Sequence, residues 1–392
     1  MYIDKIILVI VFGFFILKIS AQETQQNIKK WELSGYFKSL QGIYSLRNEA
    51  VDETTVATDA FLHSRLNFVY YPTDKITFKA ELRTRFFYGE LSKPPLAINF
   101  RENLYKTVND VVDLQVISTG EEVVLHSVFD RLYLEYILKN LEIRAGRQRI
   151  NWGVHTIWNP NDIFNAFSFT DFDHVERPGS ESIRIKYYIG ATSSIEVAAK
   201  AFNNSNDIIA GIIWKTNNNG YDFQFLSGWV NEDIAIGIGW SGGIKKIGFD
   251  GEATFFKATK DNEEDIFSGT IGLDYSFKNN TLIETGLLYN SGGSDDSSTI
   301  LGFELNAKNL YPYNWTTYIN LAKPFTPIFS GAIVILYSPV SGQPIFMNPT
   351  LSYSLGENLD VDLIGQIIFE DSPTRIYHSP TQIVYLRMSW NF

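Results

Sequence analysis

The chain has 392 residues, no cysteine, 15% aromatic residues and a net charge of −11. The absence of cysteine excludes disulfide frameworks and thiolate metal sites. The acidic balance argues against nucleic-acid binding, because a phosphate backbone is bound through a basic surface. After residue 21 no stretch approaches the roughly 20 apolar residues that a membrane-spanning helix needs.

The first 21 residues have the layout of a secretory signal peptide. Lys5 precedes a short apolar run, and Ala21 stands before a polar stretch. The alternative is a single membrane anchor, for which the apolar run is short. We therefore predict a cleaved signal peptide at residues 1–21.

From residue 33 onward, apolar and polar residues alternate in long runs, as in Ile76–Phe86 and Ile234–Trp240. Successive side chains of a strand point to opposite faces, so each run predicts a strand with one apolar and one polar face. The runs are roughly 10–14 residues long, whereas soluble strands have about 5–6 residues and a tilted membrane strand needs about 9–11. The pattern therefore favours membrane-spanning strands.

Short and long connections alternate along these runs, and one of the short turns is expected at Lys323–Phe325. Outer-membrane barrels have short periplasmic turns and longer external loops. With residues 299–310 counted as a loop, the turns predict 18 strands, and 16 is the alternative. The expected long links are 47–59, 89–125, 150–180, 291–311 and 370–380.

The last segment is amphipathic, with Val384, Leu386, Met388 and Trp390 at alternate positions before the terminal Phe392. A final strand that ends in an aromatic residue resembles the assembly signal of bacterial outer-membrane barrels. The alternative is an ordinary edge strand. Phe392 is therefore predicted to be read by the barrel assembly machinery.

These observations predict an all-β fold, a single transmembrane antiparallel β-barrel in the cell outer membrane of a Gram-negative bacterium. In lipid every backbone N–H and C=O must pair internally, which only a closed barrel achieves with strands. We expect three parts, a signal peptide at 1–21, a periplasmic N-terminal lead at 22–32 and the barrel at 33–392.

The polar alternate of each strand must face the lumen, which is wide enough to hold water at 16–18 strands. Opposed charged walls would create a transverse field that orients and selects polar solutes. The alternative is a set of ordinary wall charges that are hydrated or paired. The predicted lumen residues are basic on early strands (Arg65, Arg83, Arg85, Arg131, Arg144, Arg184 and Lys186) and acidic on later ones (Asp250, Asp274 and Glu284).

Loops 89–125 and 150–180 are too long to be simple connectors, and loops of this length are usually functional or disordered. Either could fold inward and narrow the pore. Aromatic rings beside arginines would suit a sugar, whereas the alternative is a loop that packs its own small core. The predicted constriction residues are Arg147, Arg149, Trp152, Trp158 and Asp162.

The run Gly146–Gly153 and the following Trp158–Asn165 resemble a signature of porin-like outer-membrane barrels. Asp360–Phe369, which leads into the final strand, also resembles that group, typified by alginate-export barrels and by porins for anionic solutes. The resemblance implies a barrel for export or uptake. In alginate-export barrels an arginine-rich lumen passes an anionic polymer, but the acidic later strands of this chain depart from a uniformly cationic conduit. The arginines that would take that part are Arg83, Arg85, Arg131, Arg144 and Arg184.

We therefore expect a channel for hydrophilic, anionic or saccharide solutes, with no catalytic residue, metal or cofactor. Its expected partners are outer-membrane lipid, the barrel assembly machinery and a small hydrophilic solute. The alternatives are a non-conducting structural or adhesive barrel and an outer-membrane hydrolase. A hydrolase would use His63 with Ser64, or His155 and His174 in an external loop.

Overall fold

The computed structural model describes residues 30–48, 53–90, 92–93, 111–120, 122–165, 179–200, 204, 207–261, 263–296, 305–372 and 375–392. The folded unit is Trp31–Phe392. The signal peptide predicted at residues 1–21 and His174 lie outside the described residues. Within these ranges no helix has the length and apolarity to span a bilayer.

The described residues form strands that follow one another along the chain. Their bounds are β1 Trp31–Asn48, β2 Glu53–Thr73, β3 Ile76–Gly89, β4 Gln115–Thr119, β5 Val123–Leu138, β6 Leu141–Gln148, β7 Ser180–Ile189, β8 Ser193–Lys200, β9 Ile209–Asn218, β10 Tyr221–Val230, β11 Asp233–Ile244, β12 Ile247–Lys257, β13 Ile266–Ser276, β14 Leu282–Asn290, β15 Trp315–Thr326, β16 Phe329–Tyr337, β17 Ile345–Gly356, β18 Leu359–Ser372 and β19 Arg375–Asn391.

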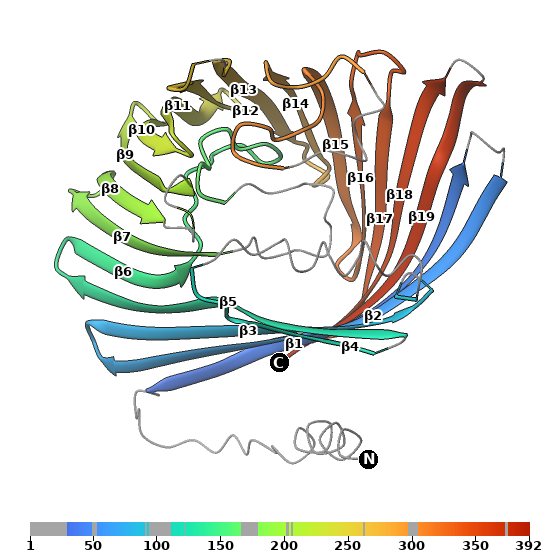
Figure 1. Ribbon diagram of the computed structural model, residues 1–392, viewed down its shortest axis with the longest axis horizontal. Helices are drawn as coiled ribbons and strands as arrows, with labels where there is room; N and C mark the ends of the chain where they lie inside the picture. Colours follow the sequence, from blue (N-terminus) through green and yellow to red (C-terminus); the bar gives the residue numbers. More distant parts are fainter. Residues whose placement is uncertain are drawn as a thin grey trace. The chain divides into compact units, whose positions relative to one another are not determined.

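Consecutive strands pair antiparallel, and β1 pairs with β19 to close the sheet into a barrel (Figure 1). The exception is β4, which pairs only with the outer half of β5, while β3 pairs directly with β5. The described residues thus form a closed ring of 18 strands with β4 as an addition. The predicted all-β barrel and its 18 strands are confirmed.

The ring closes along β1 and β19 at both the backbone and the side-chain level. Gly35 N donates to Phe392 O and Phe392 N donates to Gly35 O, each at 3.0 Å. The ring of Phe37 stacks on Trp390 at 6.5 Å between centroids. The final amphipathic segment is therefore a paired wall strand, and its recognition by assembly machinery stays a prediction.

Two predicted links and one predicted turn are wrong. In place of the link at 47–59, β1 and β2 continue until Asn48 pairs with Glu53. In place of the link at 370–380, β18 and β19 continue until Ser372 pairs with Arg375. The polar residues of these two segments suggested loops. Outside the lipid, however, both faces of a strand can contact water. The turn predicted at Lys323–Phe325 lies inside β15, because a register shift next to Pro324 tolerates its missing N–H.

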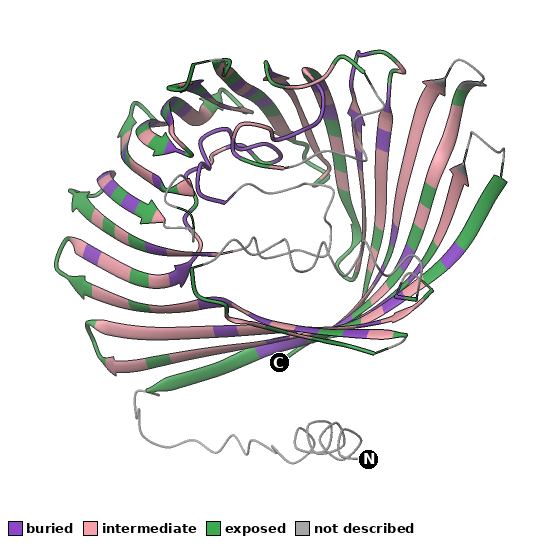
Figure 2. Cartoon of the chain, in the orientation of Figure 1, coloured by how far each residue is buried: buried purple, intermediate pink, exposed green. Residues whose placement is uncertain are grey.

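The outer face of the barrel is an apolar belt, with large side chains left exposed by the protein itself (Figure 2). Tyr187, Trp214 and Trp229 belong to it and are 51%, 46% and 41% exposed. A bilayer covers such a face, since burial of apolar surface is favourable by about 25 cal/mol per Å². Tyr188, by contrast, donates its hydroxyl to Glu142 on the inner face at 3.0 Å.

Candidate functional site

The predicted basic residues share the inner face of neighbouring strands. Cross-strand pairs set Arg83 of β3 opposite Arg65 of β2, and Arg184 of β7 opposite Arg144 of β6. Residues of the other alternate, such as Leu134 and Ile183, are exposed on the outer face. Strand register therefore brings the predicted set to one stretch of wall. We call it the basic wall, comprising Arg65, Arg83, Arg85, Arg131, Arg144, Arg184 and Lys186.

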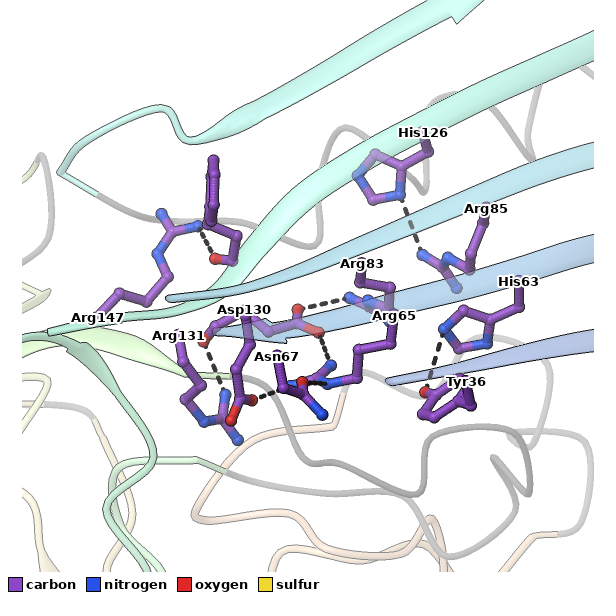
Figure 3. Close-up of polar contacts among 12 residues, drawn as sticks. Tyr36, His63, Arg65, Asn67, Arg83, Arg85, His126, Asp130, Arg131 and Arg147 are labelled. Carbon is purple, nitrogen blue, oxygen red and sulfur yellow. Dashed lines mark hydrogen bonds and ion pairs between the residues drawn. The ribbon is translucent and has the colours of Figure 1, made fainter. Parts of the chain in front are cut away.

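Arg65 is the most buried member of the basic wall, with 1% of its side chain exposed. It donates to Asp130 at 2.5 Å and also forms an ion pair with Glu81 (Figure 3). Arg83 contacts the same Asp130 at 3.0 Å. A register shift in the β3–β5 pairing beside Glu81 leaves Asp130 as an extra residue in β5, which directs it into this group. Arg65 therefore joins β2 to β3 and β5 through these ion pairs, and it is too buried to contact a solute.

A second group joins β5, β6 and β7 nearer the turns. Arg144 donates to Glu135 at 2.9 Å and lies 4.6 Å from the ring centroid of Tyr133. Arg184 forms an ion pair with Glu142. The side chains of Arg144 and Arg184 are 20% and 13% exposed, so both retain a surface toward the lumen. These pairs hold the guanidinium groups in place without hiding them.

Arg85 lies against His126 of β5, with 3.1 Å between a guanidinium nitrogen and Nδ1 (Figure 3). A guanidinium group can only donate, so Nδ1 of His126 accepts. Nε2 then carries the proton and donates to Oε1 of Gln115 in β4 at 3.3 Å. Through this chain of contacts the added strand β4 holds Arg85 at the wall.

The predicted acidic residues lie on the other side of the ring. Asp250, Asp274 and Glu284 belong to β12, β13 and β14, and Asp274 pairs directly with Glu284. Asn320 of β15 donates its amide to Glu284 at 2.5 Å. In the closed order of strands, β13 stands halfway round from β3. Basic and acidic residues therefore belong to opposite sides of the inner wall.

Residues 149–165 form an inward loop on the inner side of β8–β15, seen as the purple segment within the barrel in Figure 2. Trp152 and Trp158 are 0% and 2% exposed. Nε1 of Trp152 donates to Glu196 of β8 at 2.7 Å, and the amide of Gln224 of β10 donates to the Trp152 carbonyl at 2.7 Å. The loop is therefore packed onto the wall as a second layer.

Glu252 of β12 is the centre of this attachment and is fully buried. Its Oε1 accepts from the backbone N–H groups of Val154 and His155, each at 3.2 Å, and from the amide of Asn159 at 2.9 Å. Its Oε2 accepts from the N–H of Asn161 at 3.4 Å. One carboxylate thus satisfies donors from three places in the loop. The sequence placed Glu252 on the polar alternate but gave no sign of this role.

His155 of the inward loop is held as a neutral imidazole. Burial lowers its pKa to about 4. Its Nδ1 accepts from the backbone N–H of Ile157 at 3.1 Å, which requires that nitrogen to be unprotonated. Nε2 then faces the hydroxyl of Tyr318 in β15 at 3.4 Å. His155 therefore belongs to the packing of the loop and is not a free acid–base group.

A second segment, 305–314, continues this inner layer on the same side of the barrel. Tyr311 and Tyr313 are 8% and 1% exposed and pack with Trp158 against β14–β17. The ring of Tyr311 meets Trp158 edge-on at 5.9 Å between centroids. Two apolar clusters thus fill the interior beside β8–β17, which leaves the basic wall facing the loop layer.

Glycines in the wall make room for the inward loop. A Cβ atom added to Gly237 of β11 would lie 2.5 Å from Oδ1 of Asn161, and one added to Gly211 of β9 would lie 2.9 Å from the Trp152 ring. Such distances are too short for real contacts. The alternation of isoleucine and glycine in β11 therefore reflects the approach of the loop as well as the two faces of the strand.

Replacing Gly237 by valine is expected to lower the free energy of unfolding by about 2 kcal/mol, because the side chain would collide with Asn161. Gly243 of the same strand is the matched control, since a Cβ there meets only Ile247 O at 3.6 Å. Urea unfolding of both variants in lipid measures the difference. Equal stability of the Gly237→Val and Gly243→Val variants would show that the close fit is not needed.

The remaining predicted constriction residues lie in or beside the loop. Arg147, the last residue but one of β6, is 2% exposed and donates to Glu181 at 2.6 Å and to the carbonyl of Val112 at 2.9 Å. Arg149 follows at the start of the loop, and Asp162 is 1% exposed within it. Because the rings of Trp152 and Trp158 are buried, neither can stack on a sugar. These two side chains fit the alternative, in which the loop packs into a small core.

Those residues considered for chemistry that the structure describes are not assembled into a site. His63 is 1% exposed on the inner face, where its Nε2 lies 3.4 Å from the Tyr36 hydroxyl. Ser64 is the next residue of the same strand and so faces the other side. The two therefore cannot act as a nucleophile and its base. Among the described residues, no group of three or more His, Cys, Asp or Glu side chains could hold a metal ion.

Comparison with protein families and with characterised sequences finds no match. Solved structures do match in fold. OccK7 (OpdD) of Pseudomonas aeruginosa superposes with a TM-score of 0.60 at 9% identity, covering 93% of this chain and 99% of the other. The outer membrane protein opdK of the same species gives 0.54 at 8% identity, with 91% and 98% covered.

A BenF-like porin from Pseudomonas fluorescens Pf-5 gives a TM-score of 0.59 at 8% identity, covering 92% of this chain and 98% of the other. These matches support the porin-like resemblance and give no support to the resemblance to alginate-export barrels. The matches cover more than nine-tenths of each chain, and the closed ring and the apolar outer belt agree with them. The chain therefore forms a closed antiparallel β-barrel that has the fold of these outer-membrane porins.

Proposed function

We propose that the protein is a channel through which small hydrophilic solutes diffuse across the outer membrane, with a preference for anions. The fold of a BenF-like porin supports the channel, and the basic wall supports the preference. A closed barrel of this size has room for water unless loops fill it. No covalent step is involved.

The excess of cations on one wall is the observation that carries the anion preference. Arg144 and Arg184 share Glu142, and Arg65 and Arg83 share Asp130. Arg65 and Arg144 also pair with Glu81 and Glu135, so among the described residues four carboxylates are paired with a wall of seven basic residues, which leaves a net positive charge. A guanidinium group held in place can replace part of the hydration shell of a passing carboxylate or phosphate. Its planar set of N–H donors matches the geometry of such oxyanions.

The inner layer supports selection by size. Residues 149–165 and 305–314 occupy the side of the lumen beside β8–β17 and are anchored there by buried hydrogen bonds and apolar packing. A solute would then pass between this layer and the basic wall. Steric filtering and wall charge would act on the same narrowed path.

Swelling of proteoliposomes tests this function directly. We expect swelling in small sugars that slows as the sugar becomes larger, and entry of a small organic anion about twofold to fivefold faster than that of a cation of equal size. Swelling with no charge preference would remove the anion proposal and leave the channel. Vesicles that do not swell, although the protein is folded, would contradict the channel itself.

A further inference from the structure

Lysines gather at the end of the barrel where the short turns lie. They stand in the turns that follow β2, β5, β11 and β13 or in the last turnward residues of β15, and all are exposed. Acidic residues in or next to the described turns of this end are Asp74, Asp222, Glu357 and Asp360. We call the basic residues the rim lysines, namely Lys75, Lys139, Lys245, Lys246, Lys278 and Lys323.

The opposite end of the barrel has a different charge pattern. Its described connections are rich in aspartate and glutamate, and its lysines are paired with them. Lys257, for example, contacts Asp265 at 2.9 Å, and Lys93 contacts Glu122 at 3.6 Å. The rim lysines, by contrast, form no ion pair within the part of the chain that the structure describes. Their charge is therefore left for something outside the barrel.

Backbone geometry shows that two rim lysines stand where lysine is disfavoured. Lys139 and Lys245 have φ values of 53° and 61°, in the left-handed region. Asn219 and Asn280 take similar values in other turns of this end. Asparagine and glycine adopt this conformation more readily than lysine. The needs of the turn therefore do not explain why lysine occupies these positions. This points to an interaction that uses the lysine charge.

The position of the rim lysines identifies what they meet. Short turns of outer-membrane barrels face the periplasm, so these side chains emerge at the inner leaflet. Exposed aromatic rings such as Tyr70, Phe277 and Phe325 mark the edge of the apolar belt beside them. Lysine stems can lie along such a belt while the ammonium group reaches the headgroups. We propose that the rim lysines bind anionic phospholipid headgroups of the periplasmic leaflet.

The binding is electrostatic and does not depend on the channel function. Basic side chains at an anionic surface attract it with an energy that salt screens, and the screening length falls from about 10 Å at 0.1 M to about 3 Å at 1 M. Among the described residues, Lys93, Lys257, Lys260 and Lys308 form ion pairs, and Lys79 and Lys186 lie on the inner face. Preference for anionic lipid should therefore depend on the rim lysines.

Electron paramagnetic resonance of spin-labelled lipids around the full mature barrel tests the proposal. In phosphatidylcholine vesicles, we expect labelled phosphatidylglycerol to associate about twofold to fivefold more strongly than labelled phosphatidylcholine at low salt. The ratio should fall toward one in 1 M salt. A ratio of one at low salt would overturn the proposal, and would leave an acidic periplasmic protein as the partner to seek.

Two variants show which end of the barrel causes the preference for anionic lipid. The rim variant removes four rim lysines, and the control removes four lysines at the opposite end. Asparagine suits the left-handed turns, so the rim variant should fold, and heat-modifiable migration on gels checks this. The rim variant should lose the preference for phosphatidylglycerol, and the control should keep it. Equal loss in both variants would overturn the assignment to the rim. The rim variant carries Lys139→Asn, Lys245→Asn, Lys246→Gln and Lys278→Gln, and the control carries Lys93→Gln, Lys257→Gln, Lys260→Gln and Lys308→Gln.

Discussion

Replacing Arg83 and Arg144 together by glutamine is expected to lower the anion-over-cation permeability ratio about twofold to fivefold. The two guanidinium groups face the lumen from β3 and β6. Asp130 would keep Arg65 and Glu142 would keep Arg184. Glu135 would lose its ion pair with Arg144, but the glutamine amide can still donate a hydrogen bond to it. Reversal potentials in a salt gradient measure the ratio.

Removing acidic residues from the opposite wall is a control that should change the permeability ratio in the opposite direction. Replacing Asp250 and Asp274 by asparagine removes negative charge from β12 and β13, halfway round the ring from β3. This variant should raise the anion-over-cation ratio. If both double variants conduct with the wild-type ratio, the transverse field is not what selects ions, and the charges serve only to hold the walls.

Replacing Glu252 by alanine is expected to release the inward loop and to lower the free energy of unfolding by about 3 kcal/mol. The change leaves four buried donors without their acceptor, those of Val154, His155, Asn159 and Asn161. A loop freed from the wall would make single-channel currents noisier. It would also expose the peptide bond after Arg149 to trypsin.

Glutamine at position 252 is the matched control for the alanine variant. Its carbonyl oxygen can take the place of Oε1 and accept from Val154, His155 and Asn159, and only the 3.4 Å contact of Oε2 with the N–H of Asn161 is lost, so the Glu252→Gln variant should stay close to the wild type. Quiet currents and resistance to trypsin in the Glu252→Ala variant would show that the apolar cluster around Trp152 holds the loop without the carboxylate.

The barrel was predictable because few backbone arrangements can span a lipid bilayer. A two-residue period, long runs and internally satisfied backbone groups leave a closed ring of strands, and the assigned inner faces of β2, β3 and β7 follow from the same period. The extensions of β1 to Asn48 and of β18 to Ser372 were missed, since strands outside the lipid need no apolar face. Strand β4 was missed within the long link 89–125, where the alternation is short and irregular.

The inner layer was harder to predict, because it depends on contacts between residues far apart in sequence. Loop 150–180 was expected to narrow the pore, and its rings were considered as a sugar surface. Nothing local indicated that Trp152 would reach Glu196, or that Glu252 would bind a loop nearly a hundred residues earlier. Glycines at alternate positions of β11 were the available signal, since they leave space on the inner face.

The measurement that tests the account most directly is the conductance of the purified mature barrel in a planar bilayer under a salt gradient. We expect steady ohmic steps, with a reversal potential whose sign reports anion preference, as the basic wall predicts. Silent membranes, with circular dichroism showing folded strands, would contradict an open channel. They would mean that the inner layer and loops close the lumen and that the protein is a non-conducting barrel.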